Sequence, residues 1–339
     1  MLLRRFIAAA LALSATFCPA GAQAQSRAAQ VIEPPLARAW LQRLHQAAEQ
    51  RNYRGTQAFS SGGNVSSARV VHYSDGAQQY ESVEMLDGQM RRVFRHNDQV
   101  YTLWPQRKVA VVEQRTPLAS FPSLLQADGN ELFDHYELSS LGLDRQAEHD
   151  VEVFLLRPRD AFRFAHRLWA ELQSGLLLRA DVLDPRGDVL ESAAFLEISI
   201  GVKPQPDAVL APIRKLDGYR VIRPQIVSTQ LKQEGWSLKQ RVPGFRQVSC
   251  VKRLLPSPEA AAKGVAAEVL QAIFADGLTH VSLFVEPFDA ARHVKPMATV
   301  TGATHTLMQR HGEWWITAVG DVPITTLKQF VAALSRRKP

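Results

Sequence analysis

Cysteine is almost absent from this chain: Cys18 and Cys250 are the only two in 339 residues. Because we expect Cys18 to be removed with an export signal, Cys250 has no partner within the chain and no internal disulfide can hold the fold. Stability must therefore come from burial. A hydrophobic content of 46% over this length can form sizeable cores, and the length favours two domains over one.

Catalytic and cofactor motifs are also missing. There is no Cys-x-x-Cys pair, no His-Glu-x-x-His and no Gly-x-Ser-x-Gly elbow, and the nearest histidines, His305 and His311, are separated by a turn at Gly312. The glycines in 61–64 lie between strand-like runs, which indicates a hairpin rather than a phosphate-binding loop. We expect no cofactor, no metal and no enzymatic activity. Two carboxylates brought together by folding would escape this search, so an exported hydrolase stays open as an alternative.

Long hydrophobic runs are confined to the start of the chain. The basic pair Arg4–Arg5 precedes the uncharged stretch Phe6–Phe17, and small residues in Ala22–Ala24 suggest cleavage ahead of Gln25. The stretch is much shorter than the ~20 residues that span a bilayer. A lipid anchor on Cys18 is disfavoured because the residue before it is a bulky phenylalanine. The pattern predicts an export signal over residues 1–24.

Charge is modestly positive, with 40 basic and 33 acidic residues. The run Arg91–His96 mixes cations with Phe94, which could suit an anionic headgroup or a nucleic acid. Export argues against nucleic acid as a partner. The competing interpretation is an ordinary strand whose two-residue period sends Arg92 outward.

Hydrophobic periodicity divides the rest of the chain. Apolar residues spaced three and four apart predict a helix from Pro34 to about Arg51. After it, short alternating runs broken by Asp-Gly and Asn-Asp turns predict an antiparallel meander with one apolar face. Residues 203–218 hold three prolines and no clean period, which indicates a linker. Further strands follow, with a helix expected at about Pro258–Phe274 and a last helix, carrying Leu327 to Leu334, capped by Thr325.

The sequence resembles that of the RseB/MucB family of periplasmic regulators of the envelope-stress sigma factor. The resembling positions run in order over nearly the whole expected mature chain: Tyr53, Gly55, His72-Tyr73, Asp75-Gly76, Leu86-Asp87-Gly88, Arg95, Pro105, Asp160, Leu168-Trp169, Ser174 to Leu178, Gly187 to Glu191, Phe195, Val242 to Phe245, Asp276-Gly277-Leu278, Val281 to Glu286, Gly302-Ala303 and Val319 to Pro323.

The resemblance implies an α+β protein. Its N-terminal domain would be a half-open, curved antiparallel β-barrel with covering helices, similar to LolA and LolB, and a smaller α+β C-terminal domain would follow. The expected divisions are a signal at 1–24, a lipid-sensing domain at 25–202, a linker at 203–218 and an anti-sigma-binding domain at 219–339.

The family also implies a function. Such a protein is periplasmic and binds the periplasmic segment of a membrane-bound anti-sigma factor similar to RseA or MucA. It shields that segment from a site-1 protease of the DegS type, and lipid or lipopolysaccharide ligands release it. A lipid or lipoprotein carrier without a regulatory role is the main alternative, although a carrier needs only the cavity. Homo-oligomerisation is left open.

Candidate contact residues rest on residue type alone, because no family motif marks them. The expected lipid-binding residues are four aromatics and two arginines near an anionic head: Phe94, Trp104, Trp169, Phe195, Arg92 and Arg95. Partner contact is expected around Trp236, Phe284 and Trp314. The competing interpretation for each is core packing or solvated surface.

Overall fold

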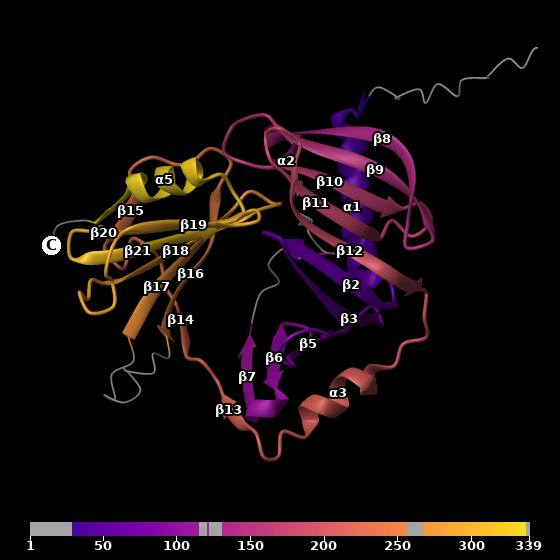
Figure 1. Ribbon diagram of the computed structural model, residues 1–339, viewed down its shortest axis with the longest axis horizontal. Coiled ribbons are helices and arrows are strands. Elements are labelled where there is room, and N and C mark those ends of the chain that lie inside the picture. The colour runs from indigo at the N-terminus through magenta and orange to yellow at the C-terminus, as the bar shows by residue number, and fades with distance from the viewer. Residues whose placement is uncertain (1–28, 115–120, 122–130, 256–266, 337–339) are drawn as a thin grey trace, which may run out of the picture.

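The computed structural model describes residues 29–114, 121, 131–255 and 267–336. The expected export signal at 1–24 lies outside the described residues. Two large β-sheets of unequal size lie side by side; among the described residues, several helices accompany the larger sheet and one helix lies on the smaller (Figure 1).

The larger sheet has thirteen strands in the order β1-β8-β9-β10-β11-β12-β2-β3-β4-β5-β6-β7-β13. Every pairing is antiparallel except that of β13 with β7. The two end strands do not pair with each other, so the sheet curves without closing. The expected half-open antiparallel sheet is confirmed.

The strands of this sheet have the following bounds: β1 Gln30–Val31, β2 Tyr53–Ser61, β3 Asn64–Ser74, β4 Gln79–Met85, β5 Arg92–His96, β6 Gln99–Trp104, β7 Val109–Gln114, β8 Tyr136–Gln146, β9 His149–Pro158, β10 Ala165–Glu171, β11 Leu177–Leu183, β12 Val189–Ile200 and β13 Arg220–Ile222. A 3-10 turn, η1 (Pro105–Arg107), joins β6 to β7, and α2 (Leu132–His135) precedes β8.

Helix α1 (Pro34–Gln50) packs against the sheet, as its sequence period predicts. Prolines suit its first turn because the amide hydrogens there have no intrahelical partner. Leu41 and Leu44 are buried on the sheet, and the ring of Trp40 lies 4.5 Å from that of Phe154. Burial of such side chains contributes up to about 1.5–3 kcal/mol each, so this apolar stripe fixes the helix in place.

The segment expected to be a linker, 203–218, contains a helix that its sequence pattern did not predict. Helix α3 (Pro206–Arg214) follows β12 and buries Val209 against β4 and β5. The sequence did not predict this helix because it contains Pro206 in the first turn and Pro212 in its interior, and an interior proline normally indicates the end of a helix. The chain then adds β13 to the edge of the larger sheet before it reaches the second sheet.

The second sheet has seven strands in the order β14-β16-β17-β18-β21-β20-β19. Their bounds are β14 Ile226–Ser228, β16 Arg246–Leu255, β17 Ala267–Ala275, β18 His280–Pro287, β19 Met297–Thr301, β20 Thr304–His311 and β21 Trp314–Gly320. A separate two-stranded pair joins β15 (Trp236–Leu238) to β22 (Leu334–Arg336).

The helix expected at Pro258–Phe274 is wrong where the structure describes it. Residues 267–275 form strand β17, paired on both sides with β16 and β18, and residues 258–266 lie outside the described residues. Val269 and Ile273 are both buried, which produced the helical spacing. In this central strand, however, Leu270, Ala272 and Phe274 are buried as well, so burial on both faces hid the strand period.

The last helix, α5 (Ile324–Ala333), is confirmed and covers the second sheet. Its N-cap is Pro323 and no side chain caps it, so the expected cap at Thr325 is wrong. Leu327, Phe330 and Val331 are almost completely buried, which places the core of this half beneath α5.

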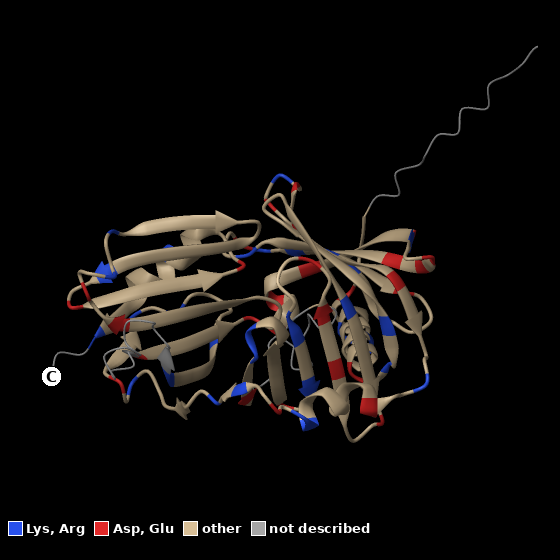
Figure 2. Ribbon diagram, turned by 60° about the horizontal axis from the view of Figure 1, so that its bottom comes forward, with Lys and Arg blue, Asp and Glu red and all other residues tan. Residues whose placement is uncertain are grey.

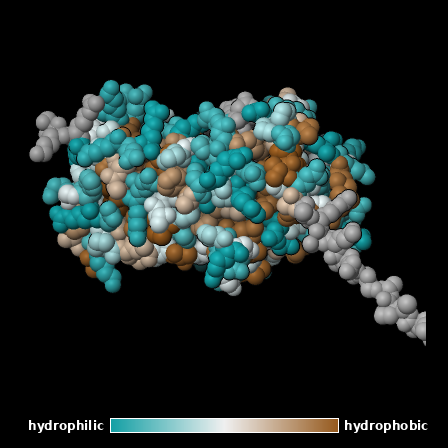
Figure 3. All heavy atoms as spheres, turned by 90° about the horizontal axis from the view of Figure 1, so that it is seen from above, coloured by the Kyte–Doolittle hydropathy of each residue, from teal (hydrophilic) through white to brown (hydrophobic). Residues whose placement is uncertain are grey.

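Charges of both signs are mixed on the described strands that Figure 2 shows. Acidic and basic positions lie next to each other on the strands of the larger sheet (Figure 2). From above, hydrophobic residues show as separate patches in a mostly hydrophilic surface (Figure 3). Among the described helices, none is long and apolar enough to cross a membrane.

Candidate functional site

A partly open cavity of about 590 Å³ lies between the two sheets. Strands β2, β3, β4, β10, β11 and β12 supply most of its wall, and the second sheet closes it with the β17–β18 turn and residues near β20 and β21. The lining residues are Gln57, Ala58, Phe59, Ser66, Ser67, Ala68, Val83, Met85, Arg91, Phe121, His166, Ala180, Val182, Glu191, Ala193, Leu278, Thr279, His280, Thr304 and Asp321. Such a volume suits one small-molecule ligand.

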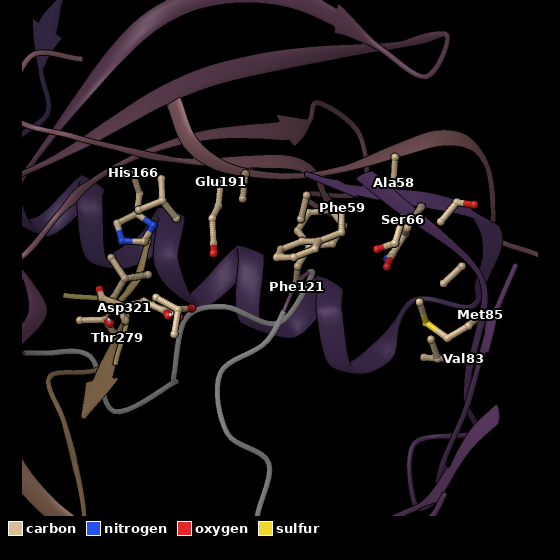
Figure 4. Close-up of a pocket in the computed structure, with 18 of the residues that line it drawn as sticks. Ala58, Phe59, Ser66, Val83, Met85, Phe121, His166, Glu191, Thr279 and Asp321 are labelled. Atoms are coloured by element: carbon tan, nitrogen blue, oxygen red, sulfur yellow. Dashed lines mark hydrogen bonds between the residues drawn. The ribbon is translucent and has the colours of Figure 1, made fainter. Parts of the chain in front are cut away.

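The cavity has two chemically different ends (Figure 4). At one end lie Val83, Met85 and Ala58 with the hydroxyl of Ser66, and the rings of Phe59 and Phe121 lie in the middle, so this part of the wall is mostly apolar. At the other end His166, Glu191, Asp321 and Thr279 bring ring nitrogens and oxygens together. An occupant that fills both ends must therefore be amphipathic.

A buried ion cluster holds the turn that closes the cavity. Arg163, just before β10, donates from Nε to Asp276 Oδ2 at 2.6 Å and from Nη2 to the carbonyl of Pro243 at 2.7 Å. Both side chains of the Arg163–Asp276 pair are fully buried. Asp160 also accepts from Arg163, and the hydroxyl of Tyr136 donates to Asp276 at 3.1 Å.

The same aspartate shapes the turn itself. Asp276 Oδ1 accepts hydrogen bonds from the backbone amides of Leu278 and Thr279, at 3.0 and 2.8 Å. An aspartate that bonds its own backbone two and three residues on fixes a turn. The cluster therefore joins the two sheets and sets where Leu278, Thr279 and His280 meet the cavity.

His166 is buried without a partner. Its side chain faces the cavity from β10, and neither ring nitrogen has a hydrogen-bond partner. Burial lowers the pKa of His166 to about 4, although the nearby Asp276 and Asp321 act in the opposite direction. The ring is therefore neutral at pH 7, with one bare nitrogen and one unpaired N–H.

Glu191 lies at the contact between the sheets. Its Oε1 accepts from Ser61 Oγ at 2.7 Å, and burial raises the pKa of this carboxyl despite that bond. Gly302, in the β19–β20 turn, approaches so closely that a Cβ there would lie 2.2 Å from Ser61 Oγ and 2.7 Å from Glu191 Cγ. Asp321 on the second sheet accepts from Thr304 Oγ1 at 2.6 Å.

The residues expected to bind lipid lie elsewhere. Phe94, Trp169 and Phe195 are buried in hydrophobic clusters, and Trp104 is half-buried at the end of β6. None of the six expected residues lines the cavity, although Phe195 lies 5.5 Å from the cavity residue Phe121, ring to ring. Their role in binding stays a prediction.

The two arginines of that set are engaged in ion pairs. Arg92 Nη2 lies 2.8 Å from Glu84 Oε1, and Arg95 Nε lies 3.9 Å from Glu81 Oε2. Such pairs on neighbouring strands match the ordinary-strand interpretation of Arg92.

The residues expected to contact a partner lie in the second half of the chain: Phe284 and Trp314 stand on the second sheet, and Trp236 stands on the separate strand β15. Trp236 is buried, and Trp314 packs edge-on against it at 5.6 Å. Arg336 stacks over Trp314 at 4.0 Å, and Phe284 is half-buried in β18. Whether a partner touches them stays a prediction.

Sequence reasoning missed His166, Glu191 and Asp321. One signal was available: His166 alternates with Leu168 and Ala170, so it stands on the apolar face of β10, where a polar side chain needs a reason. No comparable alternation marked Asp321, because its position beside the cavity depends on how the second sheet is placed against the larger one. No group of His, Cys, Asp and Glu suited to a metal occurs among the described residues.

A curved, half-open sheet with an amphipathic cavity, closed by a second domain, defines a two-domain binding protein. Family comparison agrees with that class. Residues 36–213 match the model of the MucB/RseB N-terminal domain, and residues 230–335 match that of the MucB/RseB C-terminal domain. The chain therefore belongs to the MucB/RseB family.

Individual relatives span both halves. The sigma factor AlgU regulatory protein MucB of Pseudomonas aeruginosa is 26% identical over 304 residues, 87% of this chain and 89% of MucB. The sigma-E factor regulatory protein RseB of Escherichia coli K12 is 24% identical over 298 residues, 87% of this chain and 89% of RseB. A complex structure of Pseudomonas aeruginosa MucA/MucB has the same fold, with a TM-score of 0.68 at 22% identity, covering 89% of this chain and 99% of that one.

Proposed function

We propose that this protein is a periplasmic negative regulator of an envelope-stress sigma factor. It binds the periplasmic segment of a MucA-like or RseA-like anti-sigma factor and shields it from site-1 proteolysis. A lipid in the cavity between the sheets releases it. The observation that carries the proposal is the match of both halves of the chain to the MucB/RseB family, whose members include sigma factor regulatory proteins.

The cavity supports the lipid part of the proposal. Its wall combines residues of both sheets, such as Val83 from β4 and Thr279 from the β17–β18 turn. A ligand that touches both sheets has a different affinity for different arrangements of them, and can therefore shift that equilibrium. If the partner binds one arrangement and the lipid another, each weakens the binding of the other by the same factor.

The free energy gained by burying an acyl chain is large enough for such coupling. Burying one methylene is worth about 0.8 kcal/mol, so a few methylenes in the apolar end exceed a typical coupling of about 1–3 kcal/mol. The expected weakening of partner affinity is therefore about 5-fold to 150-fold at saturating lipid.

Calorimetry tests this directly. The mature protein is titrated with the periplasmic segment of its anti-sigma candidate, with and without lipopolysaccharide. We expect tight binding that lipid weakens. Lipid binding without any partner binding would favour a carrier instead, and unchanged partner affinity at saturating lipid would refute the linkage.

A cavity-filling variant separates the two sites. Ala193 lines the cavity from β12, so Ala193→Trp should abolish the effect of lipid while leaving partner affinity intact. Ala208 is exposed on α3, away from the cavity, and Ala208→Trp serves as the matched control. Equal lipid sensitivity in both variants would place the lipid site elsewhere.

A further inference from the structure

Positive charge gathers in one layer of the second domain, formed by residues 229–245 and 324–336. These segments hold α5 and the β15–β22 pair, which lie together on one face of the second sheet (Figure 1). They contain five of the 40 basic residues of the chain but only one of its 33 acidic residues. This basic layer therefore contributes +4 to a formal net charge of +7.

The cations of the basic layer are exposed, and they are Lys232, Lys239, Arg241, Lys328 and Arg336. The first four have no ion-pair partner among the described residues, and Arg336 lies over the ring of Trp314 at 4.0 Å. The single acid, Glu234, accepts from Thr229 Oγ1 at 2.7 Å and lies 3.0 Å from Lys252 Nζ, outside the layer. Nothing within the layer therefore neutralises its cations.

The basic layer presents these cations on its outer side. Its large apolar side chains, such as Trp236 and Phe330, are buried against the sheet, so its exposed side chains point away from it. Lys232 and Arg241 line one groove of about 480 Å³ together with Arg246, which also lies 3.7 Å from Glu131 Oε2. No acidic residue is among the described residues that line this groove. The charge of this surface is complementary to an anionic partner.

The basic layer lacks the anchors of a protein interface. No large apolar side chain is exposed within it, and the nearest ones along the chain, Val227 and Val248, stand outside it. The aromatic residues beneath the groove, Trp236, Phe245 and Phe274, are already packed in the core. Protein interfaces draw most of their binding energy from such large side chains. Anionic lipid headgroups, by contrast, are attracted by a cluster of about four to eight Lys and Arg through charge alone.

We propose that the basic layer adsorbs to the anionic phospholipid surface of a membrane. Its cations contact phosphate groups at the level of the headgroups, and no part of the layer inserts among the acyl chains. This inference rests on the periplasmic location in the proposed function, but it does not depend on the cavity between the sheets. Adsorption holds the protein beside a membrane-bound anti-sigma factor and so raises the effective concentration of the two partners.

Vesicle sedimentation tests the adsorption. The full mature protein is mixed at low salt with vesicles of phosphatidylcholine alone, or with vesicles of equal parts phosphatidylcholine and phosphatidylglycerol. We expect it to bind the mixed vesicles only. All bound protein should be released at about 1 M salt, where the Debye length falls to about 3 Å. Binding that persists at this salt concentration would contradict adsorption through charge.

A triple variant assigns the binding to the layer. Lys232→Gln/Lys239→Gln/Arg241→Gln removes three cations that have no described partner, so urea denaturation should give the wild-type unfolding free energy. Each cation should contribute about fivefold to the affinity for the mixed vesicles, which corresponds to about 1 kcal/mol. The triple variant should therefore bind them about a hundred times more weakly than the wild type.

The matched control removes the same charge from the larger domain. Arg38, Arg54 and Arg145 are exposed on α1, β2 and β8, and none has an ion-pair partner among the described residues. Arg38→Gln/Arg54→Gln/Arg145→Gln lowers the net charge equally and should change the affinity for the mixed vesicles by less than about threefold, since distant charges are screened.

The outcomes separate this inference from the proposed function. If the mixed vesicles are not bound at low salt, or if the two triple variants lose affinity equally, adsorption by the basic layer is overturned, while calorimetry with the partner segment still decides the proposed function. If no vesicle is bound but the Lys232 triple variant alone weakens the partner segment, the basic layer is a protein-binding surface and the membrane inference is overturned.

Discussion

Two polar sites lie at the junction of the sheets, one around Arg163 and one around His166, only three residues apart along the chain. They differ in whether their buried polar atoms have hydrogen-bond partners. Around Arg163 the buried charge has four acceptors or neighbours in place: Asp160, Asp276, Tyr136 and Pro243. Around His166 the ring nitrogens have none. Both sites are buried, so burial alone does not mark a functional site. The difference lies in whether the protein satisfies its own polar atoms.

Removing Arg163, whose hydrogen-bond partners are all in place, should have the largest effect on the free energy of unfolding. Arg163→Met leaves Asp276 buried without its charge partner, and the loss of one partner from a buried pair typically costs about 3–5 kcal/mol. We expect the free energy of unfolding, measured by urea denaturation, to fall by that amount. The double variant Arg163→Met/Asp276→Asn should recover part of it, because the only carboxylate of the cluster that then lacks its partner is that of Asp160, which is partly exposed to solvent.

An exposed pair provides the control for that change. The Arg214–Asp207 pair on α3 has side chains that are 63% and 86% exposed. Such pairs contribute little, so Arg214→Met should change the unfolding free energy by less than about 0.5 kcal/mol. Similar losses in the two arginine variants would show that the buried cluster does not hold the sheets together.

The buried, unpaired ring of His166 should make the free energy of unfolding depend on pH. The pKa of His166 is about 4 in the folded protein, against 6.5 for an ordinary histidine. As pH falls below 6.5, the unfolded chain takes up a proton that the folded protein does not, so stability is lost between pH 6.5 and 4. From pH 7 to pH 5 this loss is about 2 kcal/mol.

The measurement compares urea denaturation at both pH values. His166→Phe and His166→Gln should each lack that 2 kcal/mol, since neither side chain titrates in this range. Two substitutions are used because phenylalanine also fills space. Equal pH dependence in wild type and both variants would contradict a buried neutral His166.

The contact between the two sheets beside Glu191 can be tested at a glycine. Gly302 has a φ of +58° and Gly312 has one of +61°, so a side chain is strained at either position. Only Gly302 faces close neighbours, Ser61 and Glu191, whereas a Cβ at Gly312 meets nothing within 4 Å. Gly302→Ala should therefore cost about 1–3 kcal/mol more than Gly312→Ala in the same denaturation experiment. Equal losses of unfolding free energy in the two variants would show that Ser61 and Glu191 can move aside for the added methyl group at little cost.

A small effect is also expected at Arg92, away from both sites. Arg92 pairs with Glu84, and its side chain is 40% exposed. Arg92→Gln should lower the unfolding free energy by less than about 1 kcal/mol, and it should leave the affinity for lipopolysaccharide unchanged. A large loss of lipid affinity in this variant would instead support the sequence-based expectation that Arg92 lies near a headgroup.

Local patterns predicted the parts of the fold that local physics determines. Helix α1 and the hairpin at Gly62–Gly63 follow from period and turn chemistry. Strand β17 did not, because burial on both faces removes the alternation that distinguishes a strand. Helix α3 was hidden by its prolines.

The cavity was less predictable than the fold. Alternation places His166 on one face of β10, but it does not say that the second sheet closes over that face. Aromatic residues such as Trp169 were chosen as ligand contacts because they are large. In the structure Trp169 is covered by Arg179, which stacks over it at 4.4 Å.

The pairing of β13 with β7 determines how freely the halves can separate. Since α3 and β13 are both attached to the larger sheet, the only unattached chain between the sheets is 223–225, which includes Pro224. Three residues reach at most about 14 Å between the flanking strands. Such a short tether keeps the second sheet at a high effective concentration beside the first, so contacts between the sheets form within one chain at little cost in entropy.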